Sequence, residues 1–169
     1  SGTVLWAGKP MSRRLRRKKA YMVMQDVGHQ LFTDSVAAEC ALGIKAPNKD
    51  EIDRTLEKVD LLAYKERHPL SLSGGQMQRL AVVVSDICGK ELLVFDEPTS
   101  GLDLKSMEEV GTLTRSLATQ GKVLLIITHD IEFMMRICTR ILFIRDGEIV
   151  KDLSDGQKEK IVRLLRGEE

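Results

Sequence analysis

An amphipathic helix between two strongly apolar segments is the feature that most constrains the fold of this chain. Residues 91–98 (ELLVFDEP) and 122–130 (KVLLIITHD) each contain a short run of large apolar residues. Between them, residues 104–121 place apolar side chains at helical spacing and end at Gly121. Apolar strands joined through a helix are typical of parallel sheets. We therefore predict an α/β fold whose parallel sheet is covered by helices on both faces.

The segments before residue 91 predict a short β region and a helical insert. Residues 2–11 resemble a strand followed by a Gly-Lys-Pro turn, and residues 19–25 (KAYMVMQ) have the length and apolarity of a second strand. Asn48 is placed to cap a helix, with Glu51 three residues later in the capping-box position. Three helices are predicted in this region, at residues 35–43, 48–62 and 74–88.

The segments after it predict a helix, a hairpin and a terminal helix. The first helix covers residues 131–138 (IEFMMRIC). The hairpin covers residues 139–152 and turns at Asp146-Gly147, a dipeptide that favours two-residue hairpin turns. Residues 155–167 (DGQKEKIVRLLRG) have the pattern of an amphipathic terminal helix.

Length and composition indicate one domain with a real core. A chain of 169 residues buries roughly 70% of its unfolded surface on folding. Its apolar runs, such as residues 123–127, are far shorter than the ~18 residues of a membrane-spanning helix, and the N-terminal residues show no signal-peptide pattern.

Three widely spaced cysteines lie among apolar residues, which favours buried thiols in a reducing compartment over a metal or redox site: Cys40, Cys88 and Cys138.

Positive charge is concentrated near the beginning of the chain. The first 25 residues contain seven basic side chains and no acidic one, although the net charge of the whole chain is +1. The run at residues 12–19 (SRRLRRKK) could bind nucleic acid or anionic lipid. Because no aromatic residues are interleaved with it, a solvated surface turn is the preferred interpretation.

Two adjacent acidic residues follow the apolar strand of residues 92–95. Open α/β sheets bind their ligands at the carboxyl edge, where Asp96 and Glu97 would emerge. In nucleotide hydrolysis the first acid of such a pair can hold Mg²⁺ through water, and the second can orient and deprotonate the attacking water. An isolated acidic pair is more often a solvated strand end, so the assignment depends on its neighbours.

Three other features are expected near the same edge. Ser73-Gly74-Gly75 places a hydroxyl and unobstructed backbone N–H groups at a helix N-terminus, which suits an anion but also describes a simple cap. His129 ends the strand next to the one that carries Asp96, where it could reach a terminal phosphate or act as a structural residue. Gln25 also ends an apolar strand. Together these features favour a phosphate-binding crevice.

Three segments resemble the motifs of ABC transporter ATPases, in the same order and spacing. LSGGQMQR (residues 72–79) resembles the signature, LLVFDEPTSGLD (92–103) the Walker B and D-loop segments, and IITHD (126–130) the switch-histidine segment. Gln25 matches the Q-loop glutamine, so the resemblance covers essentially the whole chain.

This resemblance implies an α/β, P-loop NTPase-like core with a mostly parallel sheet and an inserted helical subdomain. The expected parts are β segments with the Q-loop (residues 1–32), the helical subdomain with the signature (33–90), and the Walker B, D-loop, histidine, hairpin and helix segments (91–169). No G-x-x-x-x-G-K-[ST] loop occurs in these residues. Because that Walker A loop precedes the segment resembling residues 1–11 in the family, we expect an ABC ATPase domain whose first portion is absent.

The resemblance also implies ATP and Mg²⁺ as cofactors and a role for each matching residue. Asp96 would assist Mg²⁺, with Gln25 contributing through water or nucleotide, and Glu97 would be the catalytic base or water-positioning group. His129 would contact the γ-phosphate, and Asp103 would lie at the dimer seam. Four residues would bind the nucleotide held by a second ABC ATPase domain paired head to tail: Ser73, Gly74, Gly75 and Gln76.

A finer resemblance is to the energy-coupling factor importers of vitamins and metal ions. It is carried by QDVGHQLFTDSVAAE (residues 25–39) and by IVKD after RDGE (145–152). Asp26-Val27 stands where the family often has Asn-Pro, and Lys90 where it commonly has Pro. These departures resemble the second half of coupling-factor ATPases that carry two halves in one polypeptide.

The resemblance therefore implies the ATP-hydrolysing subunit of an importer. Such a subunit is cytoplasmic and is held on the inner face of the membrane by a transmembrane subunit, here through residues 25–36, and no nucleic-acid partner is expected. Two alternatives stay open. One is a non-catalytic half whose signature turn completes a partner's site, which the missing Walker A loop favours. The other is a soluble ABC protein acting on ribosomes or DNA, which the basic segment suits but QLFTDSV (30–36) opposes.

Overall fold

The computed structural model describes residues 2–157, 160 and 163. The chain forms two compact units, Ser1–Ile127 and Thr128–Glu169. Each unit has its own strands and apolar core. No helix within the described residues is long and apolar enough to cross a membrane.

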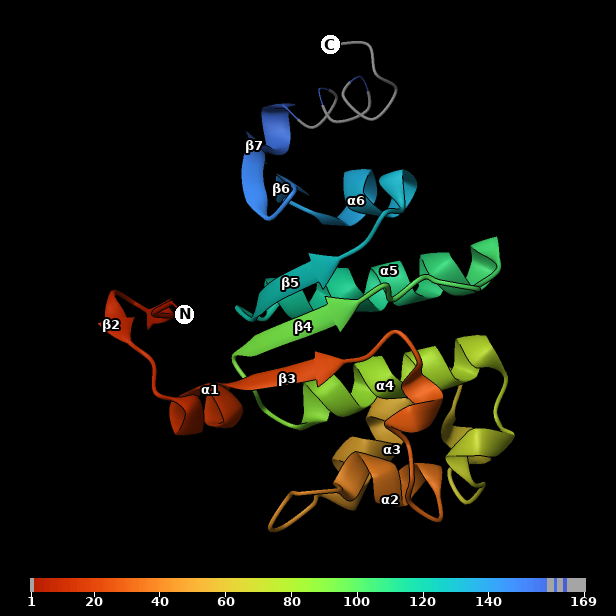
Figure 1. Ribbon diagram of the computed structural model, residues 1–169. Coiled ribbons are helices and arrows are strands. Elements are labelled where there is room, and N and C mark those ends of the chain that lie inside the picture. The colour runs from red at the N-terminus through yellow and green to blue at the C-terminus, as the bar shows by residue number, and fades with distance from the viewer. Residues whose placement is uncertain (1, 158–159, 161–162, 164–169) are drawn as a thin grey trace. The chain divides into compact units, whose positions relative to one another are not determined.

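A three-stranded parallel sheet organises the first unit. Its strands are β3 (Ala20–Val23), β4 (Leu92–Asp96) and β5 (Val123–Ile127), in the order β3-β4-β5. Their carboxyl ends therefore share one edge of the sheet (Figure 1). The predicted parallel α/β architecture is confirmed.

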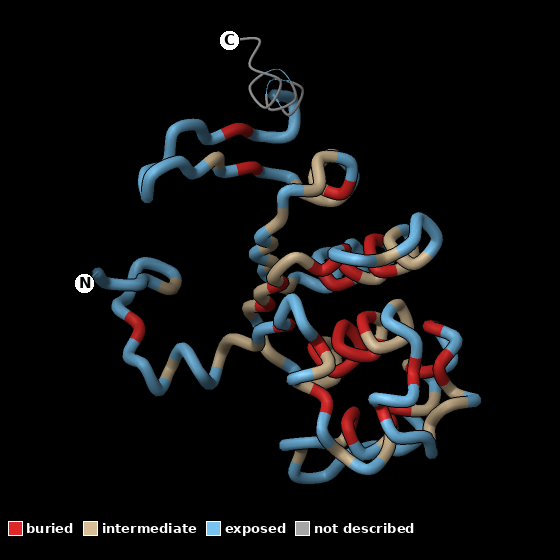
Figure 2. Tube along the Cα trace, turned by 45° about the vertical axis from the view of Figure 1, so that its right-hand side comes forward, coloured by how far each residue is buried: buried red, intermediate tan, exposed pale blue. Residues whose placement is uncertain are grey.

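Two long helices pack against one face of this sheet: α4 (Gly74–Ile87) and α5 (Leu104–Thr119). The strand register places Leu93 and Phe95 on that face, in a core shared with Ala81 and Val82 of α4 and with Val110 of α5. Figure 2 shows buried residues gathered along these helices.

The opposite face of the sheet is apolar but accessible. Met22, Val94 and Leu125 form one row across the three strands, and the two outer members, Met22 and Leu125, are 45% and 50% exposed. Within the described residues, the prediction of a sheet covered on both faces is therefore wrong. The sequence predicted strands buried on both faces because their residues are apolar at every position. Such a run does not distinguish a strand packed on one face from a strand packed on two.

A second core lies between α4 and the helical insert. The insert contains α2 (Val36–Ala41) and α3 (Lys49–Glu57), and its buried side chains pack on Leu80, Val83 and Val84 of α4. Helix α4 is thus buried on two sides, as its run of apolar residues requires. Asn48 caps α3 as predicted, accepting hydrogen bonds from the backbone N–H groups of Asp50 and Glu51. Three single 3-10 turns complete this region: Val27–His29, Leu62–Tyr64 and Pro69–Ser71.

The beginning of the chain differs from the prediction in two ways. Strands β1 (Leu5–Trp6) and β2 (Lys9–Pro10) form an antiparallel pair whose turn is Ala7-Gly8, both with positive φ, rather than Gly-Lys-Pro. The basic run is a helix, α1 (Arg13–Lys19), and not a surface turn. The Ser12 hydroxyl caps this helix by accepting from the Leu15 N–H, and basic side chains in its last turn oppose the negative end of the helix dipole.

The second unit is a short helix followed by a hairpin. Helix α6 (Ile131–Ile137) precedes β6 (Arg140–Arg145) and β7 (Glu148–Ser154), which pair antiparallel around Ile141 and Leu153. The predicted turn at Asp146-Gly147 is confirmed, with φ values of +52° and +83°. Residues Asp155–Gln157 form a 3-10 turn, and the rest of the predicted terminal helix lies outside the described residues, apart from positions 160 and 163.

Candidate nucleotide-binding site

The acidic pair lies where the sequence predicted it, at the carboxyl edge of the sheet. Asp96 is the last residue of β4 and pairs with Ile127 in the strand register. Glu97 follows with a φ of +47°, and its backbone N–H donates to the Ile127 carbonyl at 2.8 Å. A left-handed residue with a side chain costs about 1–2 kcal/mol, which the neighbouring hydrogen bonds must offset.

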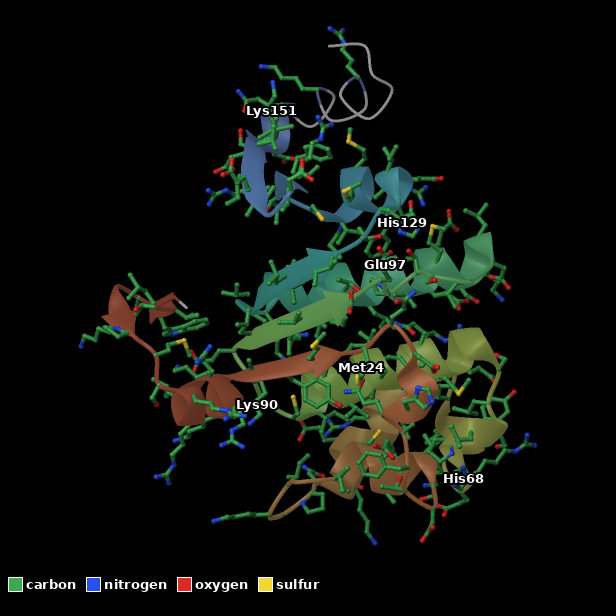
Figure 3. The ribbon with its side chains drawn as sticks, viewed as in Figure 1. Met24, His68, Lys90, Glu97, His129 and Lys151 are labelled. Carbon is green, nitrogen blue, oxygen red and sulfur yellow. The ribbon has the colours of Figure 1, made fainter. Side chains whose placement is uncertain are left out.

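The turn after β4 keeps Glu97 at this edge. The Glu97 carbonyl accepts from the Ser100 N–H at 3.1 Å, and Pro98 and Thr99 within the turn are buried. Figure 3 shows Glu97 and Met24 at the same edge of the sheet, while Lys90 lies at the other. The backbone position of Glu97 is thus fixed by hydrogen bonds on both sides of the residue.

Ser73 begins α4 with a complete capping box. Its hydroxyl oxygen accepts from the Gln76 N–H at 3.3 Å, and the Gln76 Oε1 accepts from the Ser73 N–H at 2.9 Å. The sequence allowed two interpretations of this segment, a helix cap and an anion-binding site. The cap is confirmed, and the anion-binding site stays a prediction. The backbone N–H groups of Gly74 and Gly75 lie in the first helical turn, where helices leave such donors unpaired.

Gln25 is exposed and lies two residues beyond the end of β3, and the loop after it is tied back to that strand. Gln30 makes these ties with its side-chain amide. Its Oε1 accepts from the Met24 N–H at 3.0 Å, and its Nε2 donates to the Met22 carbonyl at 2.7 Å and to the Tyr21 hydroxyl at 3.0 Å. Sequence reasoning missed Gln30, because nothing in the pattern around it separates a structural amide from a surface one.

A pocket of about 350 Å³ brings three of the predicted segments together in the first unit. The Q-loop contributes residues 25–28, helix α4 contributes Gly74, Met77 and Gln78, and the turn after β4 contributes residues 100–102. A second pocket, of about 370 Å³, lies between the end of α3, α4 and α5 and is lined by none of the predicted site residues. The ion pair between Arg79 and Glu109 is part of the lining of that second pocket.

Asp103 is exposed and caps α5. Its Oδ1 accepts from the Ser106 N–H at 2.7 Å. This backbone hydrogen bond, a further bond with the Ser106 side chain, and the nearby charges of Lys105 and Arg79 hold the pKa of Asp103 below its ordinary value. Asp103 is therefore anionic at neutral pH.

His129 lies in the second unit, just before α6, and is exposed (labelled in Figure 3). The next residue, Asp130, caps α6 by accepting from the Phe133 N–H at 3.0 Å. The proximity of His129 to Asp96 and Glu97 stays a prediction.

The donor groups at the sheet edge suit Mg²⁺. The described residues contain no cluster of three or more potential metal-binding side chains. Mg²⁺ is commonly held by one or two carboxylates together with water and substrate phosphates, so a dedicated protein cage is not required. The carboxylate of Asp96 and the amide oxygen of Gln25 are both oxygen ligands of the kind that Mg²⁺ prefers.

Comparison with known proteins assigns the family. The family model described as "ABC transporter" matches residues 1–100. A putative ABC transporter ATP-binding protein of Treponema denticola is 57% identical over 161 residues, covering 95% of this chain and 33% of that protein. A second such protein from T. denticola is 46% identical over 90% of this chain and 31% of its own length. The chain thus spans about a third of the length of these two relatives.

Solved structures agree with this assignment. The chain matches cbiO1 from Clostridium perfringens, described as part of the ABC transporter complex cbiONQ, with a TM-score of 0.80 and 28% identity over 99% of this chain and 71% of that one. The ATP-binding cassette MJ0796, solved as a dimer with ADP and Pi, matches with a TM-score of 0.75 over 92% of this chain and 74% of that one. At 22% identity the second match supports the fold alone. The predicted P-loop NTPase-like fold is confirmed, and the chain belongs to the ABC transporter family of ATP-binding domains.

Proposed function

We propose that these residues belong to a protein that binds and hydrolyses ATP with Mg²⁺, and that this hydrolysis drives transport. The observation that carries the proposal is the placement of Asp96 and Glu97 at the carboxyl edge of a parallel sheet, with Glu97 held in a left-handed turn. Parallel α/β sheets bind ligands at this edge, and a strained residue there is typical of a functional site.

Each residue predicted for this site is assigned a role by its chemistry. The Asp96 carboxylate would hold Mg²⁺ through water, and the Gln25 amide oxygen would be a second ligand group. Glu97 orients and deprotonates the attacking water, and His129 contacts the γ-phosphate. Mg²⁺ in this site would neutralise charge on the phosphate oxygens.

The start of α4 serves a different nucleotide. The backbone N–H groups of Gly74 and Gly75, with Ser73 and Gln76, present a helix N-terminus that suits a phosphate. A lone helix end contributes about 0.3–1 kcal/mol toward an exposed anion, whereas micromolar binding requires about 8 kcal/mol. We therefore assign this turn to ATP held mainly by a second ABC ATPase domain, with Asp103 at the seam between the two.

The finer proposal is an importer of the energy-coupling factor type. It is supported by the likeness to cbiO1, which is part of a transporter complex, and by the sequence of residues 25–39. The protein would then act at the cytoplasmic face of the membrane, bound to a transmembrane subunit through residues 25–36. Selection of a vitamin or metal ion would belong to other subunits.

Glu97→Gln in the full-length protein tests the catalytic assignment. The variant keeps the size of the side chain and one acceptor oxygen but cannot take a proton. We expect kcat for ATP hydrolysis to fall at least 100-fold, while ATP binding measured by calorimetry is retained. Glu66→Gln, an exposed acid in the same unit, is the matched control and should keep wild-type turnover. Wild-type kcat in Glu97→Gln would contradict the role of Glu97, and an inactive wild-type protein would contradict the proposed function.

A further inference from the structure

The pocket between the Q-loop and the start of α4 is lined by a buried glutamine, Gln78. Gln78 is 5% exposed. Its Nε2 atom has no hydrogen-bond partner among the residues that the structure describes. Buried polar side-chain atoms nearly always have such a partner, so an exception at a candidate site calls for a functional explanation.

The neighbouring glutamine on the same helix shows the contrast. Gln76 uses its side-chain oxygen to accept from the Ser73 N–H, which completes the capping box. Gln78 lies two residues later, on a different side of α4, and contributes no bond to the cap. The structural need for an amide at the start of this helix is therefore met without Gln78.

Hydrogen-bond acceptors line the same pocket. The Q-loop contributes Gln25 and Asp26, and the turn after β4 contributes Ser100. Asp26 Oδ1 accepts from the Gly28 N–H at 3.1 Å and Oδ2 lies 3.1 Å from His29 Nδ1, and each carboxylate oxygen has a second lone pair. The Asp26 side chain is 67% exposed, so it can turn toward Gln78 while Val27 stays packed in the core.

We propose that Gln78 is a positioning residue, whose amide donates to an oxygen of the loop formed by residues 25–28 when ATP closes two domains together. The bond gives the buried Nε2 atom a hydrogen-bond acceptor and fixes Gln25 relative to α4. Helix α4 and residues 25–28 then move together when the domains close. Gln78 acts through Gln25 and touches no reacting atom. The inference rests on the proposed ATPase function, because it concerns the closed, nucleotide-bound state.

Two substitutions in the full-length protein test this role. Gln78→Met fills similar space without a donor, and Gln78→Glu keeps the shape and the acceptor oxygens but lacks the N–H groups. Three quantities are measured: the melting temperature without nucleotide, kcat for ATP, and KM for ATP. For Gln78→Met we expect a melting temperature at or above that of the wild type, because an unpaired buried donor is removed. We expect kcat to fall about tenfold in both variants, the size of one lost hydrogen bond, with KM within about twofold.

A structural role predicts a different pattern. If Gln78→Met lowered the melting temperature and kcat together, Gln78 would be a packing residue and the inference would fail. Wild-type kcat in Gln78→Met, or in Gln78→Glu, would likewise show that the donated bond is not used. Ser85→Ala is the control on the same helix: Ser85 is buried, bonds the Val82 carbonyl and lies outside the pocket, so its kcat should stay at the wild-type value. If the wild-type protein hydrolyses ATP in these assays, the proposed function stands whatever the result for Gln78.

Discussion

Gly75 on α4 packs so closely against Ser106 on α5 that a Cβ at position 75 would lie 2.4 Å from the Ser106 hydroxyl oxygen and 2.9 Å from its Cβ. Real side chains essentially never approach this closely, so one of the two helices must shift if residue 75 gains a side chain. The adjacent Gly74 has nothing within 4 Å of the same position. Only one of the two glycines is therefore required by packing within this chain.

The first prediction compares alanine at these two glycines. Gly75→Ala should lower the free energy of unfolding by about 1–3 kcal/mol, because overpacking forces the helices apart. Gly74→Ala should be neutral or slightly stabilising, since alanine restricts the unfolded chain without a clash. Urea unfolding of the full-length variants measures both, and Ser106→Gly should restore much of the stability of Gly75→Ala. Equal losses at the two positions would contradict the packing argument.

The second prediction concerns the pH dependence of the cap on α5. Hydrogen bonds from Ser106 lower the pKa of Asp103 below its ordinary value of 3.8. A carboxylate with a lowered pKa in the folded state stabilises the protein above its unfolded pKa, and this contribution is lost as the pH falls through the folded value. Asp103→Asn removes the titrating group but keeps a good cap. The stability difference between wild type and variant should thus be constant from pH 7 to about 5 and shrink below about pH 4, as followed by urea unfolding. A difference that grows on acidification would show that the sign is wrong.

Several elements could be predicted from the sequence because the signal is local. The strands at residues 92–96 and 123–127 are uninterrupted apolar runs, Asn48 is a strong capping residue, and Asp146-Gly147 suits a two-residue hairpin turn. The position of the acidic pair could be predicted from the strand at residues 92–96, because the carboxyl end of a parallel strand lies at a known edge of the sheet.

The elements that sequence reasoning missed depend on contacts between distant residues. The basic run at Arg13–Lys19 has no apolar face to mark it as a helix, and it is stabilised by the Ser12 cap and by pairing of Lys19 with Glu91. Gln30 and Gln78 are amides whose environments become buried or tied only after folding. Glutamine side chains are mostly exposed, so the residue type predicts a surface position for both. Only the fold shows that Gln78 is buried and that Gln30 bonds to β3.

The third prediction concerns Glu39, a carboxylate that is 2% exposed. Its Oε2 accepts from the backbone N–H groups of Phe32 and Thr33, at 3.1 and 2.9 Å, and from the Thr33 hydroxyl at 2.8 Å. Glu39→Ala leaves these donors without an acceptor and should cost about 3 kcal/mol of stability. Glu39→Gln keeps an acceptor oxygen and should cost distinctly less. Urea unfolding distinguishes them, and similar losses for both variants would mean that the negative charge, rather than the acceptor, is what matters.

The fourth prediction follows from the same loop, which holds Phe32 away from the core. Phe32 is 68% exposed although its backbone N–H is fixed by Glu39, so the ring is presented to solvent by an ordered loop. If residues 25–36 contact a transmembrane subunit, Phe32 is a natural anchor, because aromatic side chains supply much of the binding energy at protein interfaces. Phe32→Ala should then weaken binding to that subunit about tenfold, measured by titrating the purified full-length variant onto the subunit in detergent.

Leu104→Ala, which removes a side chain 58% exposed on α5, is the control and should bind normally. ATP hydrolysis by the unbound variant should match the wild type, since Phe32 is not among the proposed nucleotide-binding residues and does not line the pocket that contains Gln25 and Gly74. Normal binding by Phe32→Ala would remove this loop from the proposed interface.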